Sequence, residues 1–355
     1  MKGNVLVTGA AGAIGPVLVQ LLLKRGYQVR VLDQQQGAPA LFPPGVPVIV
    51  GDINDRLMVD KAVEDVDVVF HLAAKLHLNN PPPEVLAEYR RVNVEGTRTI
   101  AQAARAAGVK RLVLFSTINV YGPSQPGQLL DEDSPLRPES LYAHTKCQAE
   151  QIALAEVPTV VLRLAAVYGP NMKGNYPRLL EALRRGRFVW VGDGTNRRTL
   201  VHVRDVCAAA VLAAERPEAT GKIYNVTDGT VHTLREIVET ICGALGRKPP
   251  RLRIPAAAAS WAAALADMSA RCLLWRQTSA KAAVQKLTED IAVRGERIVK
   301  ELGFRPQYDL VRGWHDTVFA RGSAALGASH DHFCAARDGR AGAANPSRRK
   351  EYEAV

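Results

Sequence analysis

The chain has 355 residues, of which 47% are hydrophobic and 23% are charged. This composition excludes a wholly disordered chain, and the length favours two domains or one large core with an insertion. With 46 Lys and Arg against 35 Asp and Glu, the net charge is +11, which favours anionic partners. Because the sequence has no nucleic-acid-binding motif and no metal-ligand spacing, a phosphate-bearing small molecule is the simplest such partner.

Short β-branched runs alternate with helical segments through the first half of the chain. Strands are predicted at Val5–Thr8, Gln28–Leu32, Val46–Val50, Asp67–His71, Arg111–Phe115 and Thr159–Leu162. Helices are predicted at Ile14–Arg25, Glu84–Ala107 and Leu141–Ala155. The alternation predicts an α/β fold, a doubly wound parallel sheet of the Rossmann type with helices on both faces.

The pattern changes after about Ala166, where turn signals such as Gly192-Asp193-Gly194 replace the regular alternation. Helices are still expected at Arg178–Arg185 and Leu234–Leu245. We therefore predict a smaller C-terminal α/β substrate domain and a tail that is largely disordered. The predicted boundaries are 1–165 for the Rossmann domain with a returning strand near 222–227, 166–319 for the substrate domain, and 320–355 for the tail.

The cysteines and the apolar stretches indicate in which cellular compartment the protein is expected. The five cysteines are widely scattered and form no CxxC pair, which is typical of reduced thiols in the cytoplasm. The first residues lack the features of a signal peptide. The apolar stretch from Pro255 to Trp275 is interrupted by Asp267 and Arg271, so we expect a core or interface helix there rather than a membrane span. Peripheral membrane contact stays open.

A glycine-rich turn, Thr8-Gly9-Ala10-Ala11-Gly12-Ala13-Ile14-Gly15, joins the first predicted strand to the first predicted helix. Gly9 would permit the tight turn, Gly12 would let the backbone approach a pyrophosphate, and Gly15 would let the helix pack closely on the strand. Asp33 follows the second strand, where a carboxylate accepts the adenosine ribose hydroxyls and repels a 2′-phosphate. Since no arginine follows it directly, the pattern predicts NAD rather than NADP.

Tyr142 and Lys146 lie four residues apart on one predicted helix, so their side chains project from one face. An ammonium group beside a phenol stabilises the phenolate, so we expect Lys146 to lower the pKa of Tyr142 from about 10 and to make it an acid or base near neutral pH. Thr117, which closely follows the fifth strand, could hydrogen-bond the same substrate oxygen, with Ser116 as the neighbouring alternative.

These residues resemble the extended short-chain dehydrogenase/reductases that act on nucleotide sugars, and the resemblance covers about residues 3–318. Further matching stretches are Gly51-Asp52-Ile53, His71-Leu72-Ala73-Ala74, Val92-Asn93-Val94-Glu95-Gly96-Thr97, Ser116-Thr117-Ile118-Asn119-Val120-Tyr121-Gly122 and Tyr142-Ala143-His144-Thr145-Lys146. The resemblance implies Thr117, Tyr142 and Lys146 as the catalytic set, and a homodimer through the helices Glu84–Ala107 and Leu141–Ala155. The implied NAD site comprises Gly9, Gly12, Ala13, Ile14, Gly15, Asp33, Asp52, Ile53, Leu72, Ala73, Ala74, Asn93, Tyr142 and Lys146.

The same resemblance extends to the segment around Arg197 and Arg198, where these enzymes hold the nucleotide diphosphate. It implies Arg198 as the phosphate-binding arginine, whose guanidinium fork suits a pyrophosphate. With Ser116 and Thr117, this residue forms the expected substrate site. His202 is interpreted as a structural histidine.

The chain departs from the family pattern in two places. Ala166 stands where many members carry an asparagine, so one polar contact to the diphosphate is absent or replaced. A second phosphate-binding arginine has three candidate positions, Arg276, Lys281 and Arg294.

The sequence thus favours an NAD-dependent 4-epimerase of a nucleotide-activated sugar, a UDP-hexose or UDP-N-acetylhexosamine. The main alternative is an NAD(P)H-dependent 4-keto-sugar reductase of polysaccharide biosynthesis. A non-catalytic NAD-binding sensor and a sterol-like dehydrogenase are less favoured. No metal is expected, because the segment His330-Asp331-His332-Phe333-Cys334 lies in the low-complexity tail.

Overall fold

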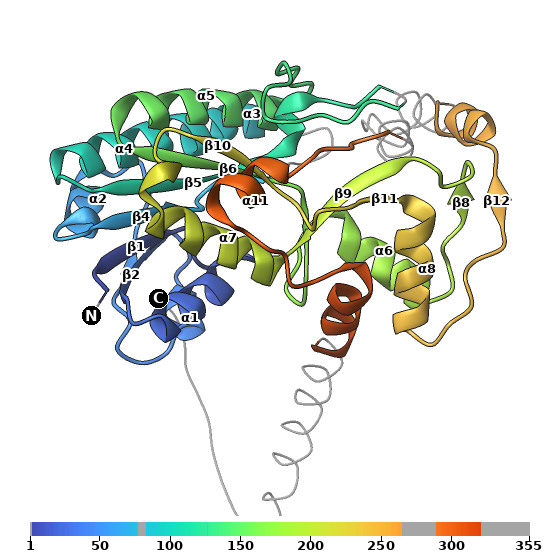
Figure 1. The fold of residues 1–355 in the computed structure, drawn as a ribbon, viewed down its shortest axis with the longest axis horizontal. Helices are drawn as coiled ribbons and strands as arrows, with labels where there is room; N and C mark the ends of the chain where they lie inside the picture. The colour runs from blue at the N-terminus through green and yellow to red at the C-terminus, as the bar shows by residue number, and fades with distance from the viewer. Residues whose placement is uncertain (1, 77–82, 126, 265–288, 321–355) are drawn as a thin grey trace, which may run out of the picture.

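A seven-stranded parallel sheet forms the centre of the computed structural model, which describes residues 2–76, 83–125, 127–264 and 289–320 (Figure 1). The strand order is β10-β6-β5-β4-β1-β2-β3, and every neighbouring pair is parallel. The strands are β1 (Asn4–Thr8), β2 (Gln28–Asp33), β3 (Val48–Val50), β4 (Val68–His71), β5 (Arg111–Thr117), β6 (Thr159–Leu164) and β10 (Ile223–Val226). The order reverses at β1, as it does in doubly wound sheets, so the predicted Rossmann fold is confirmed.

Helices cover both faces of this sheet (Figure 1). They are α1 (Gly15–Lys24), α2 (Arg56–Val63), α3 (Pro83–Arg90), α4 (Gly96–Ala106), α5 (Leu141–Glu156) and α7 (Val203–Glu215), with short turns η1 (Ala38–Leu41) and η4 (Pro217–Ala219). Successive strand residues point to opposite faces, so Val5 and Val7 pack under α1 and α7, while Leu6 packs under α2 and α4. Both faces are therefore buried, which explains the unbroken apolar strands.

The helix predicted over Glu84–Ala107 is confirmed as a helical stretch, but it is not α-helical throughout. A π-helical segment, η2 (Arg91–Glu95), separates α3 from α4. Asn93 within it is 1% exposed, and its side chain bonds the chain after β4 and the helix α5. The wider turn gives this polar side chain its place between the two elements, which is typical of π-segments near functional sites.

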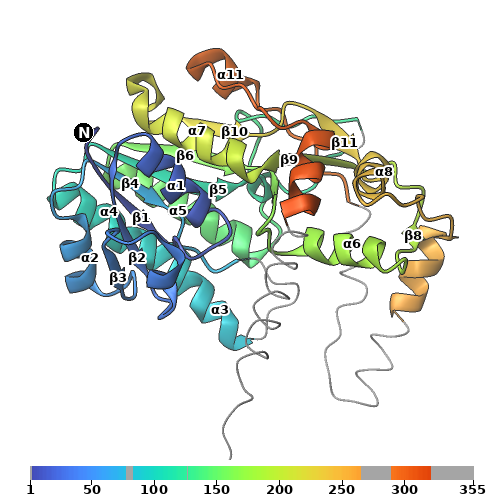
Figure 2. The same cartoon turned by 90° about the horizontal axis from the view of Figure 1, so that it is seen from below.

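Smaller sheets lie to one side of the central sheet (Figure 2). They contain β7 (Ala166–Tyr168), β9 (Arg197–His202) and β11 (Val231–Thr233), and separately β8 (Trp190–Val191) paired with β12 (Arg253–Ile254). The helices of this part are α6 (Asn175–Arg184), α8 (Leu234–Ala244) and α11 (Glu296–Leu302); residues 256–264 and 310–320 are also helical. Sequence patterns missed α7, because it follows β9 without an intervening Gly or Pro and its N-cap is His202, not one of the common capping residues.

Several predictions fall outside the described residues. They concern the tail from 321 onward, which includes the His330–Cys334 segment, and two candidates for the second phosphate-binding residue, Arg276 and Lys281. Arg294 is described and lies just before α11, where its carbonyl accepts a hydrogen bond from Asn225. Over the ranges that the structure describes, no helix is both long enough and apolar enough to cross a bilayer.

Candidate active site

In the glycine turn, Gly9 and Gly15 leave no room for a side chain, whereas Gly12 does. Gly9 has φ +68°, and a Cβ there would lie 2.5 Å from the Ala73 Cα. A Cβ on Gly15 would lie 2.1 Å from the carbonyl oxygen of Ala10. A Cβ on Gly12 would meet only the Gly9 carbonyl, at 3.3 Å, so this position leaves its outer side free for a close ligand.

The start of α1 has the features of an anion-binding site. Ile14 at its N-cap makes no side-chain cap, and Pro16 lies in the first turn. The first backbone N–H groups of a helix lack intrahelical partners, and the helix dipole adds positive potential there. This end of α1 therefore fits the diphosphate of a dinucleotide.

Asp33 ends β2 beside the glycine turn and is 4% exposed. Its two carboxylate oxygens accept from the backbone N–H groups of Ala11 at 2.8 Å and Gln35 at 2.9 Å. Each oxygen retains a second acceptor site, because a carboxylate offers about four. The carboxylate is thus held by the backbone and can still accept ribose hydroxyls, so the turn, the helix end and this acid together fit a dinucleotide.

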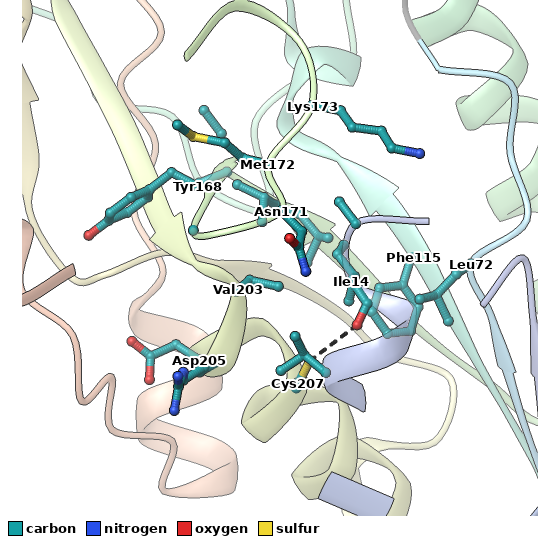
Figure 3. A pocket seen from close by; sticks show the side chains of 18 of the residues that line it. Ile14, Leu72, Phe115, Tyr168, Asn171, Met172, Lys173, Val203, Asp205 and Cys207 are labelled. Atoms are coloured by element: carbon teal, nitrogen blue, oxygen red, sulfur yellow. Dashed lines mark hydrogen bonds between the residues drawn. The ribbon is translucent and has the colours of Figure 1, made fainter. Parts of the chain in front are cut away.

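A cavity of about 1480 Å³ opens at the carboxyl ends of β5 and β6, in front of α1. Ser116, Thr117 and Tyr142 line it together with predicted cofactor residues Ala13, Ile14, Leu72 and Ala74. Figure 3 shows Ile14, Leu72 and Phe115 on one side, and the loop from Tyr168 to Lys173 with Val203 and Cys207 on the others. The Cys207 thiol lies 3.9 Å from the Ile14 carbonyl oxygen, which links α7 to the start of α1.

Tyr142 and Lys146 come from α5, whose first turn is capped by the Ser140 hydroxyl accepting from the Ala143 N–H at 3.2 Å. Tyr142 lines the cavity, while Lys146, 2% exposed, lies one helical turn further in. Burial, with a smaller effect of Tyr89, raises the pKa of Tyr142 to about 12. The predicted lowering of this pKa by Lys146 is therefore wrong for the protein alone, because the cost of burying a phenolate dominates.

Lys146 is itself affected by burial, which lowers its pKa to about 8 although Glu150 acts in the opposite direction. Between about pH 8 and the ordinary value of 10.5, the unfolded chain therefore binds more protons at this residue than the folded protein does. The buried charge destabilises the fold below pH 8, and the free energy of unfolding rises with pH through this window.

Lys146→Met is expected to remove this pH dependence. The difference in unfolding free energy, variant minus wild type, should fall by about 3 kcal/mol between pH 7.5 and 10.5, since 1.36 kcal/mol corresponds to one pKa unit. Urea denaturation of both proteins across this range measures the difference. A difference that stays constant with pH would show that Lys146 has an ordinary pKa.

A buried polar network lies directly behind these residues. Arg163 of β6 donates to both carboxylate oxygens of Glu150, at 2.7 Å for the closest contact, and the two side chains are 3% and 4% exposed. The Ser116 hydroxyl donates to the same carboxylate. Arg163 also donates to the Tyr121 hydroxyl at 2.9 Å, which in turn donates to Asn225 at 2.8 Å.

The network distinguishes the two candidate hydroxyls. The Ser116 proton is directed to Glu150, whereas the Thr117 hydroxyl caps η3 (Ile118–Tyr121) by accepting from the Asn119 N–H at 3.2 Å. Among the described residues the Thr117 hydroxyl only accepts, so its proton can be donated to a ligand in the cavity. Sequence reasoning missed Glu150. An acid four residues after Lys146 on the same helix indicates that the two side chains lie close together. Nothing in the sequence indicates that Glu150 pairs with Arg163.

Three other predicted cofactor residues have structural partners. The Asn93 amide accepts from the Lys75 N–H at 2.7 Å and donates to the Thr145 hydroxyl at 3.0 Å, next to Lys146. Asp52 pairs with Arg91 at 2.6 Å. Burial opposes ionisation of Asp52, but its hydrogen bonds to Asn54 and Arg91 outweigh this and lower its pKa. Ile53, 7% exposed, packs where a Cβ on Gly96 would otherwise lie.

The predicted phosphate arginine does not join this cavity. Arg198 lies on β9, where its guanidinium donates to the Glu289 carbonyl, and it is absent from the described residues that line the cavity. Its neighbour Arg197 pairs with Asp290 at 2.8 Å. His202 accepts from the Arg204 N–H and stacks on Tyr308, and burial lowers its pKa to about 4, which agrees with a structural histidine.

Comparison with known proteins reveals relatives over most of the chain. Residues 5–227 match the NAD dependent epimerase/dehydratase family. The chain is 34% identical over 307 residues to a 4-hydroxy-2-methyl-3-oxo-4-farnesyl-3,4-dihydroquinoline-1-oxide ketoreductase of Stigmatella aurantiaca, covering 84% of this chain and 90% of the relative. It is 30% identical to an N-acetyl-alpha-D-glucosaminyl-diphospho-ditrans,octacis-undecaprenol 4-epimerase of Escherichia coli O157:H7, covering 72% and 76%.

A solved structure with the same fold is the UDP-glucose 4-epimerase of Thermus thermophilus in complex with NAD. It is 29% identical to this chain, with a TM-score of 0.71. The match covers 90% of this chain and 99% of the other, so the likeness includes the smaller sheets as well as the central one.

Proposed function

The chain belongs to the NAD-dependent epimerase/dehydratase family, and from this premise we propose that it inverts C4 of a nucleotide-activated sugar through a transient 4-keto intermediate. Its cofactor is NAD. The observation that carries the proposal is the cavity that Thr117 and Tyr142 line together with the start of α1. The UDP-glucose 4-epimerase of Thermus, with its similar fold, supports a UDP-hexose or UDP-N-acetylhexosamine as substrate.

Four residues would carry the proton chemistry and its orientation. Tyr142 accepts the proton of the C4 hydroxyl, and Thr117 donates a hydrogen bond to the same oxygen. Lys146 supplies a positive charge behind the phenol, and Glu150 favours the charged form of that ammonium. When bound against Gly12 and the start of α1, NAD supplies the acceptor and donor of hydride, and its nicotinium charge favours the phenolate. Tyr142 returns its proton once the sugar has presented its other face.

Asp33, Gly9, Gly12 and Gly15 would bind the adenosine and diphosphate half of NAD. Ala13, Ile14, Leu72, Ala73 and Ala74 would form the wall next to it, while Asp52, Ile53 and Asn93 complete the proposed cofactor site. Arg198 does not line the cavity among the described residues, so its role in binding the substrate diphosphate stays a prediction from the family resemblance. A homodimer through α3, α4 and α5 also remains a prediction.

A 4-keto-sugar reductase is the second candidate, because the Stigmatella relative is a ketoreductase. An epimerase regenerates its cofactor in each turnover, whereas a reductase consumes one reduced cofactor for each product. The purified protein is therefore incubated with UDP-glucose or UDP-N-acetylglucosamine without added reduced cofactor. The proposal predicts formation of the C4 epimer until equilibrium is reached. Absence of the epimer, with consumption of NADH or NADPH by a 4-keto sugar, would establish the reductase instead.

Asp33→Ala is expected to weaken NAD binding by about 10- to 100-fold, since hydrogen bonds to a charged group contribute about 1.5–3 kcal/mol. NADP binding should weaken less, because the variant no longer repels a 2′-phosphate. Fluorescence titration of both dinucleotides measures the change. Asp60→Ala is the matched control, as Asp60 is exposed and pairs only with Arg56 among the described residues. An unchanged ratio of NAD to NADP affinity in the Asp33 variant would rule out the ribose contact.

A further inference from the structure

The segment after α8 carries an unusual concentration of exposed cations. Four of them lie within seven residues, and their side chains are all exposed: Arg247, Lys248, Arg251 and Arg253. No Asp or Glu occurs between residues 245 and 264. β12 and the helical residues 256–264 follow, at the edge of the molecule farthest from α2 (Figure 1). The proposed reaction uses none of these residues.

Large apolar side chains are exposed within the same segment. Trp261 is 74% exposed, Leu252 64% and Ile254 40%. Scattered exposed apolar residues are ordinary on protein surfaces, but three of them in one short stretch that carries four cations and no acid are not. We name residues 247–261 the basic edge.

A second group of cations adjoins the basic edge. Arg184, Arg185 and Arg187 are exposed at the end of α6. A Cβ on Gly186, between them, would lie 3.6 Å from the Arg247 guanidinium, so the ends of α6 and α8 bring both groups together. Only Arg185 of these three has a described acidic partner, Glu181 at 2.6 Å. The local field is therefore positive beyond the basic edge itself.

We propose that the basic edge docks this protein on the surface of an anionic lipid bilayer. Lys and Arg near such a surface are attracted to its phosphates, and an exposed Trp partitions to the interface between headgroups and acyl chains. Trp261, Leu252 and Ile254 lose their contact with water on docking, while the four cations stay at headgroup level. A nucleic acid would satisfy the cations but would leave Leu252 and Ile254 in water.

An internal comparison supports the importance of charge. Leu57 on α2 is 82% exposed, more than Trp261 of the basic edge. Its neighbours are Asp55, which caps α2, and Asp60, which pairs with Arg56. An anionic bilayer has no net attraction for that surface, so Leu57 provides a matched control for an exposed apolar residue without the surrounding cations.

Sedimentation of the full-length protein with vesicles tests the proposal. We expect binding to phosphatidylcholine vesicles that contain phosphatidylglycerol, weak binding to pure phosphatidylcholine, and release by salt. In a variant carrying Arg247→Gln, Lys248→Gln, Arg251→Gln and Arg253→Gln, affinity should fall by several hundred-fold, because each cation contributes a factor of about five. Turnover of a soluble UDP-sugar and thermal unfolding should not change, so a failure of docking and a failure of the proposed reaction remain distinguishable.

Trp261→Ala tests insertion separately from charge. The fluorescence emission of the wild type should shift to shorter wavelength on anionic vesicles, and Trp261→Ala should lose this shift and bind at least tenfold more weakly, whereas Leu57→Ala should behave as the wild type does. Equal binding to both vesicle types, or full binding by the four-residue variant, would overturn the proposal. So would the absence of vesicle binding together with binding to duplex RNA or to a second copy of the chain.

Discussion

Tyr142→Phe is expected to reduce turnover of the nucleotide sugar by about 1,000-fold, within the range that general acid–base catalysis contributes. Phe keeps the ring that lines the cavity and packs edge-on against Tyr89, at 6.5 Å between centroids, but it can neither take nor return a proton. NAD affinity and thermal stability should remain close to those of the wild type. The rate of epimer formation at saturating substrate, measured beside NAD binding, reports both properties.

Tyr224→Phe is the matched control for this loss. Tyr224 is fully buried on β10, and its hydroxyl lies 2.9 Å from Glu301, away from the cavity. Its replacement removes a buried phenol without touching the proposed chemistry, so turnover should be retained. If the Tyr142 variant kept more than about a tenth of wild-type turnover, Tyr142 would not be the general acid–base group, since such groups contribute 100-fold or more.

Glu150→Ala is expected to lower the free energy of unfolding by about 3–5 kcal/mol, because it leaves the buried Arg163 charge without its partner. The same substitution also changes the active site. Without Glu150, the Ser116 hydroxyl has no acceptor in that network, and Lys146 loses the charge that favours its ammonium form. Urea unfolding measures the stability, and the pH profile of turnover measures the effect on Lys146, which should lose its proton at lower pH in Glu150→Gln.

Two further variants show whether Glu150→Ala loses stability because the Arg163 charge is unpaired or because the core packing is damaged. Replacing Glu150 and Arg163 together by Met removes both charges, so this double variant should be more stable than Glu150→Ala. Glu181→Ala breaks the exposed pair with Arg185 and should cost less than about 1 kcal/mol. A double variant as unstable as the single one would show that the packing around α5 matters, and not the charge balance.

Sequence patterns predicted the central sheet because its signals are local. Strands buried on both faces read as unbroken apolar runs, and Gly9 and Gly15 mark a turn whose geometry admits no side chain. The π-segment at Arg91–Glu95 was missed. Its Asn93 bonds Thr145, fifty-two residues away, and sequence spacing does not reveal such a contact. The helix α7 was missed for lack of an ordinary capping residue.

The candidate site could be predicted in its composition but not in its electrostatics. Thr117 and Tyr142 share a cavity, as the motifs indicated. The direction of the Tyr142 pKa depends on how deeply the phenol is buried, which spacing on a helix does not reveal. Likewise, Glu150 and Arg163 meet only because α5 packs on β6. The sequence also does not reveal that Arg198 donates to the Glu289 carbonyl and is not among the described residues that line the cavity.

The fate of the hydrogen on C4 gives the most direct test of the mechanism. UDP-glucose carrying deuterium at C4 is converted by the enzyme, and the product is examined by mass spectrometry and proton NMR. We predict that the epimer keeps its deuterium at C4, with slower turnover than the unlabelled sugar, since the hydride that leaves this carbon is the one that returns. Loss of the label to solvent, or inversion at a different carbon, would contradict oxidation and re-reduction of one sugar at one site.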